Sequence, residues 1–183
     1  SLHDALPILN TPVFASEEVF ARQCKQLRTL VRPFVFRKYL DFGALEALRE
    51  LHEKIRAETA RRELLRGSIG VNVKLGRGGI REIEFITQTM QIIRGGRDPQ
   101  LQGRSTLAML SALGEENFLD PAIAHQCQLD YIFLRNVEHA IQYIDDEQTQ
   151  MLPSTGEKPV AIATLLGVQP GALWKEVHAD RKS

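Results

Sequence analysis

DPAIAHQCQLDYIFLRNVEHAIQYIDD, residues 120–146, is the stretch that decides the fold. Asp120 before Pro121 is typical of a helix start, because aspartate caps the first turn and proline fits its first position. Apolar side chains then return every three or four residues for about six turns, at Ile123, Cys127, Tyr131, Leu134, Val137, Ile141 and Ile144. The stretch therefore predicts one long helix with a buried face.

Helical spacing continues on both sides of that stretch, and capping residues mark where the helices begin and end. We predict helices at about 16–33, 41–65, 80–95, 105–114, 157–166 and 170–180. Residues 69–75 differ, because every second residue from Ile69 to Val73 is apolar, and a period of two indicates a strand. The predicted fold is mainly α, a multi-helix bundle or array with at most one short strand near the glycine-rich loop.

Composition places the chain among ordinary globular proteins. Of its 183 residues, 43% are hydrophobic and 25% are charged, and 23 basic side chains balance 23 acidic ones, so no basic excess indicates a nucleic-acid partner. The charges are uneven, with 17 basic and 12 acidic residues in 1–100 but 6 and 11 in 101–183. No apolar run is long enough for a transmembrane helix, so we expect no membrane partner. Cys24 and Cys127 lack metal-ligand spacing, which predicts reduced thiols and a cytoplasmic location.

The two ends do not match the pattern of the rest. Residues 1–11 contain no initiator Met and no clear continuity with the helix that follows, so we expect a non-native or linker segment. Residues 181–183 directly follow a helical pattern, and we expect them to be non-native as well. On this hypothesis the chain is an internal piece of a longer protein.

The strongest local signal is the glycine-rich turn Gly76-Arg-Gly-Gly79, which lies between the predicted strand and the helix that begins at residue 80. Glycines let the backbone approach a ligand closely, and the first amides of a helix attract anions. Cations surround this turn, so the candidate phosphate- or AMP-facing residues are Lys74, Gly76, Arg77, Gly78, Gly79, Arg81 and Glu84. A tight structural turn is the alternative, since the spacing matches neither a Walker A motif nor a dinucleotide fingerprint.

Glu84 enters that set through its position relative to Arg81. The two lie three residues apart on one helix face, so Glu84 either orients Arg81 toward an anion or forms a plain intrahelical ion pair. Glu82 points about 200° away from Glu84 around the helix, so the two carboxylates cannot form a metal site from one helix. We predict no metal site in the chain.

A polar ridge follows the long helix predicted at residues 120–146. Its members are candidate domain-docking residues, and a solvated ridge is the alternative; they are Arg135, Glu138, His139, Gln142 and Asp146. His139 has no second His or Cys at ligand spacing, which argues against a metal there.

Five motifs together resemble one protein family. They are RPFVFRKYLDF at 32–42, NVKLGRGGIREIEF at 72–85, QIIRGGR at 91–97, FLRNVEH at 133–139 and DDEQTQMLP at 145–153. Across about residues 12–180, the sequence resembles the bifunctional glutamine synthetase adenylyltransferase/adenylyl-removing enzyme of bacteria.

The resemblance implies an enzyme with two homologous halves, each a nucleotidyltransferase domain followed by a helical domain. One half moves AMP from ATP onto a glutamine synthetase tyrosine, and the other removes it by phosphorolysis. GGIREIEF at 78–85, with the stretch from VEH at 137–139 to QT at 148–149, looks more like the N-terminal, adenylyl-removing half. Residues 12–40 would then be the tail of the upstream nucleotidyltransferase domain or a linker helix. Residues 41–180 would be a helical domain of the glutamine synthetase adenylyltransferase/PII-uridylyltransferase type.

The chain departs from the family pattern in one respect. The family's catalytic signature contains an Asp-x-Asp strand that holds Mg²⁺, and this chain has no Asp-x-Asp. The resemblance therefore implies that the catalytic carboxylates lie upstream. It also implies that Mg²⁺ and ATP serve the parent enzyme, and that this chain alone holds neither and is inactive.

The partners that the resemblance implies are glutamine synthetase, the PII signal protein and the missing nucleotidyltransferase domain of the same chain. One alternative is a non-catalytic interaction module that binds glutamine synthetase or the PII protein. Another is the helical domain of a PII uridylyltransferase.

Overall fold

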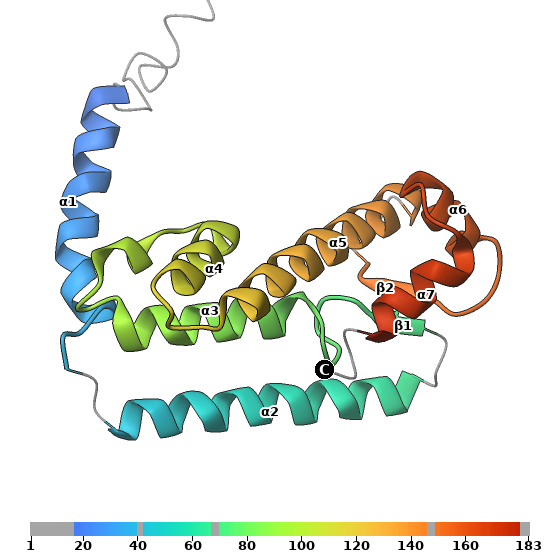
Figure 1. Ribbon diagram of the computed structural model, residues 1–183, viewed down its shortest axis with the longest axis horizontal. Helices are drawn as coiled ribbons and strands as arrows, with labels where there is room; N and C mark the ends of the chain where they lie inside the picture. Colours follow the sequence, from blue (N-terminus) through green and yellow to red (C-terminus); the bar gives the residue numbers. More distant parts are fainter. Residues whose placement is uncertain (1–16, 40–41, 67–69, 146–148, 180–183) are drawn as a thin grey trace, which may run out of the picture.

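The structure is a computed structural model that describes residues 17–39, 42–66, 70–145 and 149–179 (Figure 1). Helices dominate these residues, so the predicted mainly α fold class is confirmed. The elements are α1 (Glu17–Val35), α2 (Phe42–Arg66), β1 (Gly70–Asn72), α3 (Ile80–Arg94), the 3₁₀ helix η2 (Pro99–Gln102), α4 (Thr106–Glu115), α5 (Pro121–Asp145), β2 (Met151–Pro153), α6 (Lys158–Leu165) and α7 (Pro170–Ala179). The expectations for residues 1–11 and 181–183, and the candidate Asp146, fall outside the described residues.

The buried face of α5 organises the core. Leu134, Val137 and Ile141 are at most 1% exposed. They belong to one cluster with Ile80 of α3 and Leu110 of α4. In Figure 1, α3 and α4 lie along the first part of α5, while α6 and α7 pack at its far end. The apolar stripe predicted at residues 120–146 is thus the axis of the domain.

The described part of the chain contains two strands, which corrects the prediction of at most one. β1 pairs antiparallel with β2, so that Val71 faces Leu152 across the pair. A single strand would leave its backbone N–H and C=O groups unpaired in the interior, which is costly. The partner comes from residues 151–153, where the sequence indicated only the end of the long helix at Pro153. Val71 and Leu152 are both buried, so this small sheet forms part of the core.

α1 and α2 are less embedded than the other helices. α1 projects from one edge of the molecule (Figure 1), and none of its residues is buried. The helix was predicted to end at about residue 33, yet Pro33 sits in its last turn and the helix continues to Val35. α2 runs beside α3, where His52 stacks on Phe85 with 4.2 Å between ring centroids. Within the described residues, no helix combines the length and apolar character needed to cross a membrane.

Candidate functional site

The glycine-rich turn after β1 is closed by its own hydrogen bonds. Asn72 Oδ1 accepts from the backbone amides of Lys74 and Leu75, at 3.0 and 2.8 Å. The amide of Gly76 donates to the carbonyl of Asn72 at 3.0 Å, and that of Gly79 donates to the carbonyl of Gly76 at 2.9 Å. Gly78 has a φ of 68°, a left-handed conformation that favours glycine. The turn is therefore a compact structural unit.

The first amides of α3 also have acceptors within the chain. Those of Ile80, Arg81 and Glu82 donate to backbone carbonyls at 3.0–3.1 Å. The amide of Gly78 donates to the Glu82 carboxylate at 2.9 Å. The amides that were predicted to attract an anion are thus occupied by the protein itself. The exposed guanidinium groups of Arg77 and Arg81 are the parts of the predicted site that face solvent.

Gly79→Ala is expected to lower the free energy of unfolding by about 1–3 kcal/mol, because a Cβ there would overpack the turn. It would lie 2.7–2.9 Å from the carbonyl oxygens of Gly76, Lys74 and Val73. Urea unfolding followed by circular dichroism measures the change. Gly171→Ala is the matched control, because a Cβ at Gly171 meets nothing within 4 Å. Equal midpoints for the two variants would contradict the described packing of the turn.

Lys74 links the turn to α5 through a buried carboxylate. Its ammonium lies 3.0 Å from Glu138 Oε1, and the guanidinium of Arg135 lies 2.7 Å from Glu138 Oε2. The side chain of Glu138 is only 2% exposed, whereas those of Lys74 and Arg135 are 26% and 37% exposed. Two cations at the surface thus enclose one buried anion. Lys74, predicted to face phosphate, contacts this carboxylate instead.

Glu84 forms the ion pair that the sequence predicted, and Tyr131 joins it. Arg81 Nη1 lies 3.0 Å from Glu84 Oε2, and the hydroxyl of Tyr131 donates to Glu84 Oε1 at 3.3 Å. Glu82 faces elsewhere and pairs with Arg56 of α2 at 3.3 Å, so the two carboxylates are separate, as their spacing predicted. Tyr131 was predicted only as part of the apolar stripe. Tyr131 lies one helical turn before Arg135, a candidate docking residue. That spacing is the sequence signal that could have placed Tyr131 among the candidate site residues.

The residues predicted for docking do not share one environment. Glu138 is buried inside the domain at 1% exposure, so it cannot lie on an exposed ridge. Its position four residues after Leu134 puts it at the edge of the buried stripe, which explains the burial. Arg135 and Gln142 are half-buried and His139 is exposed. Docking through these three residues stays a prediction.

Three of the five motifs meet at the glycine-rich turn. The 72–85 motif supplies the last residue of β1, the turn and most of the first half of α3. The 133–139 motif supplies Arg135 and Glu138, which hold Lys74. The 145–153 motif supplies β2, the partner of β1. These motifs are distant in sequence, and their contacts make the turn one assembly, named here the turn assembly.

The other two motifs meet at the end of α3. The ring of Phe36 packs against Gly95, and the backbone of Arg37 lies against Gly96 so closely that a Cβ there would clash. Arg97 Nε donates to the carbonyl of Lys38 at 3.4 Å. The 91–97 motif therefore anchors the 32–42 motif, and this contact fixes where α1 leaves the domain.

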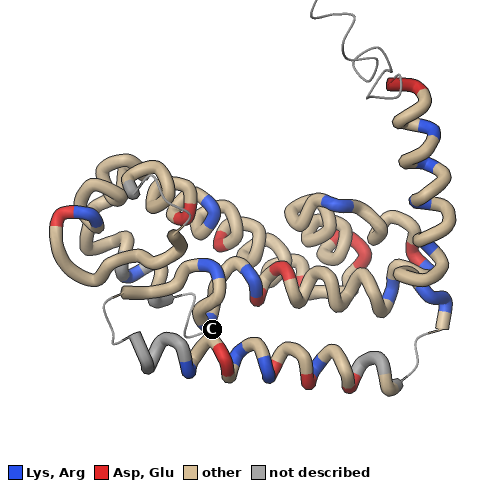
Figure 2. The backbone as a smooth tube through the Cα atoms, turned by 180° about the vertical axis from the view of Figure 1, so that it is seen from behind, with Lys and Arg blue, Asp and Glu red and all other residues tan. Residues whose placement is uncertain are grey.

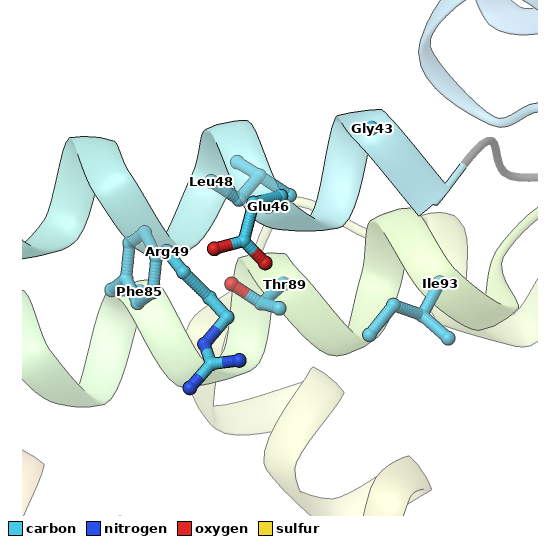
Figure 3. Close-up of a pocket in the computed structure, with 7 residues that line it drawn as sticks. All are labelled: Gly43, Glu46, Leu48, Arg49, Phe85, Thr89 and Ile93. Carbon is cyan, nitrogen blue, oxygen red and sulfur yellow. The ribbon is translucent and has the colours of Figure 1, made fainter.

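A cavity lies on the other side of α3, between it and α2 (Figure 3). It has a volume of about 660 Å³ and is mostly apolar, lined by Gly43, Glu46, Leu48, Arg49, Phe85, Thr89 and Ile93. Phe85 and Ile93 belong to the 72–85 and 91–97 motifs, but no pattern in the sequence indicated a cavity here. Among the described residues, no group of His, Cys, Asp and Glu side chains is placed to hold a metal ion.

Comparison with known proteins gives the family. The model of the family described as GlnD PII-uridylyltransferase matches residues 49–182, most of the chain. The chain belongs to this family. The match begins within α2, so α1 lies outside it.

Three relatives carry the name bifunctional glutamine synthetase adenylyltransferase/adenylyl-removing enzyme, which confirms the resemblance based on motifs. The protein of Chromobacterium violaceum is 52% identical over 141 residues, which are 77% of this chain and 15% of that protein. Those of Bordetella pertussis and Pseudomonas aeruginosa are 49% and 45% identical over 161 and 154 residues. These cover 87% and 84% of this chain, but 17% and 15% of the relatives. The chain thus spans about a sixth of the length of the curated relatives it matches.

Proposed function

We propose that this chain is the helical domain of an enzyme that adds AMP to glutamine synthetase and removes it again. The observation that supports this most directly is the turn assembly. Three motifs of the proposed enzyme family, far apart in sequence, supply the groups that contact one another there. About half of the residues are identical to relatives with that name over most of the chain.

Within that enzyme, we assign the chain to the half that removes AMP. Of the two stretches that suggested this half, the one at 137–149 supplies Glu138, and its partner Lys74 lies four residues before the one at 78–85. The described residues offer no carboxylate cluster for Mg²⁺, so we place Mg²⁺ and ATP in another part of the parent enzyme. The exposed guanidinium groups of Arg77 and Arg81 are then the groups through which this domain would reach phosphate or AMP.

A chimera tests the proposal. In the Chromobacterium violaceum protein, the segment that matches this chain is replaced by the corresponding residues of this chain. We expect the folded chimera to react adenylylated glutamine synthetase with orthophosphate, so that the tyrosine–AMP bond breaks and ADP leaves. It should also transfer AMP from ATP to unmodified glutamine synthetase. The intact C. violaceum protein is the positive control.

The chain alone is the matched negative control, and we expect it to catalyse neither reaction. A folded chimera without phosphorolysis would contradict the proposal, and so would turnover by the chain alone. The family description favours a second candidate, the helical domain of a PII uridylyltransferase. A chimera with a PII uridylyltransferase that is active, when the first chimera is not, would support this second candidate.

A further inference from the structure

Arg81, the arginine that would reach phosphate or AMP under the proposed function, is held on one side by the domain. Its Nη1 lies 3.0 Å from Glu84 Oε2, and the side chain of Glu84 is only 16% exposed. A guanidinium carries five N–H donors in one rigid plane. A carboxylate on one edge therefore sets the direction of the whole group and leaves other donors for a second anion.

Glu84 is in turn held by a side chain of another helix. The hydroxyl of Tyr131 on α5 donates to Glu84 Oε1 at 3.3 Å, so the two oxygens of this carboxylate have separate partners. The ring of Tyr131 packs against the hydrophobic core. Its hydroxyl is therefore placed by the core of the domain rather than by a flexible surface side chain.

The contacts continue from Tyr131 to the turn assembly. The guanidinium of Arg135 lies over the ring of Tyr131, 5.9 Å from its centroid, where a cation is attracted to the face of the ring. The same guanidinium lies 2.7 Å from the buried Glu138, which also pairs with Lys74. Figure 2 shows basic and acidic residues close together where the beginning of α3 passes α5. A continuous series of side-chain contacts thus connects Arg81 to a buried charged group.

We propose that Glu84 and Tyr131 are positioning residues for Arg81. Tyr131 orients the Glu84 carboxylate, and Glu84 holds the Arg81 guanidinium toward phosphoryl oxygens, those of orthophosphate or of the AMP group. A long side chain that is ordered beforehand loses less rotamer freedom when it binds a ligand. The distance of 3.3 Å is long for a hydrogen bond between two oxygens, so the effect of the hydroxyl alone is modest. The kinetic part of this inference rests on the proposed function, whereas the ordering of Arg81 is measured without it.

Tyr131→Phe tests the ordering in the chain itself. Phenylalanine keeps the ring that packs against the core and removes only the hydroxyl that contacts Glu84. The order parameter of the Arg81 Nε–H bond, measured by NMR relaxation, should fall in this variant. Ser111→Ala is the matched control, because its hydroxyl also donates to a carboxylate, Glu115 Oε1 on α4, at 2.8 Å. It should leave the order parameter unchanged, and an unchanged value in Tyr131→Phe would overturn the proposal.

Kinetics of the folded chimera test the consequence for the reaction. Tyr131→Phe should lower kcat/KM for phosphorolysis of adenylylated glutamine synthetase about two- to tenfold, as expected when a long side chain has to be ordered on binding. In the Arg81→Ala background the same substitution should have no effect, because the hydroxyl acts through that arginine. A raised KM for orthophosphate would place Arg81 at orthophosphate, and a raised KM for adenylylated glutamine synthetase would place it at the AMP group. Ser111→Ala should leave the kinetics unchanged.

The possible failures of this inference and of the proposed function are distinct. If Tyr131→Phe slowed the reaction equally in the Arg81→Ala background, the hydroxyl would act without Arg81 and the proposal would be wrong. Normal kinetics for Tyr131→Phe, with Arg81→Ala impaired, would reject the positioning role and keep the proposed function. A folded chimera without phosphorolysis would contradict the proposed function, and the order parameter would still decide whether Tyr131 orders Arg81.

Discussion

The double variant Lys74→Met/Arg135→Met is expected to lose about 3–5 kcal/mol of unfolding free energy, because it leaves a buried carboxylate without a cation. Glu138 has a side chain that is 2% exposed, and the two removed groups lie 3.0 and 2.7 Å from its oxygens. Methionine keeps much of the length and the apolar stem of both side chains, so the change is mainly one of charge. Urea unfolding of the four proteins in the double-mutant cycle measures it.

A third substitution, Glu138→Gln, should have opposite effects on stability with and without the two cations. In the otherwise unchanged chain, Glu138→Gln should destabilise by about 1–3 kcal/mol, because the amide loses the charge-assisted contacts. In the double variant the same substitution should stabilise, because it removes the stranded charge. If Glu138→Gln changed stability equally in both backgrounds, the three groups would not form a coupled network.

Lys54→Met is the matched control for this network. Its ammonium lies 3.6 Å from Glu50 on the surface of α2, and the two side chains are 77% and 60% exposed. Ion pairs of this kind contribute about 0.3–0.5 kcal/mol. A cost at Lys54 comparable to that in the buried network would mean that lysine-to-methionine changes destabilise for a reason other than burial of the partner.

Local signals were enough to place most of the helices. Ser105 accepts a hydrogen bond from the amide of Ala108 and begins α4, as predicted. Gly95 follows the last residue of α3, close to the predicted end of that helix at about residue 95. Such signals act within one turn of the chain, so the sequence carries them directly. The strand at 151–153 depends instead on β1, about 80 positions earlier, and its short apolar run gave no period to detect.

The candidate site was harder to predict. Whether it can bind an anion depends on which of its amides and cations already have hydrogen-bond or ion-pair partners within the chain. The cations and glycines of the turn were found, since residue type and spacing suffice for that. The sequence did not show that the amides of the turn already donate hydrogen bonds within the chain. That depends on the side chains of Asn72 and Glu82 folding back onto the turn. The contact of Lys74 with Glu138 spans 64 positions, and no local pattern in the sequence indicates a partner so far away.

Arg81→Ala in the chimera described above is expected to lower kcat/KM for phosphorolysis of adenylylated glutamine synthetase about ten- to a hundredfold. With the amides of the turn occupied, a phosphate or AMP group would have to be held by guanidinium groups. Loss of one charge-assisted hydrogen bond costs about 1.5–3 kcal/mol, and each 1.4 kcal/mol corresponds to about a tenfold change in rate. Arg81 is 57% exposed at its side chain, so its ion pair with Glu84 leaves part of the guanidinium open to solvent.

Arg56→Ala separates this role from a structural one. Arg56 is also an exposed arginine, at 51%, and it pairs with Glu82 beside the same turn at 3.3 Å. Both substitutions remove an exposed guanidinium from a largely buried carboxylate, since the side chains of Glu84 and Glu82 are 16% and 26% exposed, so both should lower the unfolding midpoint to a similar extent. Only Arg81→Ala should lower kcat/KM if its guanidinium faces the reacting group. Equal kinetics for the two variants, with both chimeras folded, would make the turn a purely structural element. Its cations would then serve to join α2, α3 and α5, and the phosphate would be held elsewhere in the enzyme.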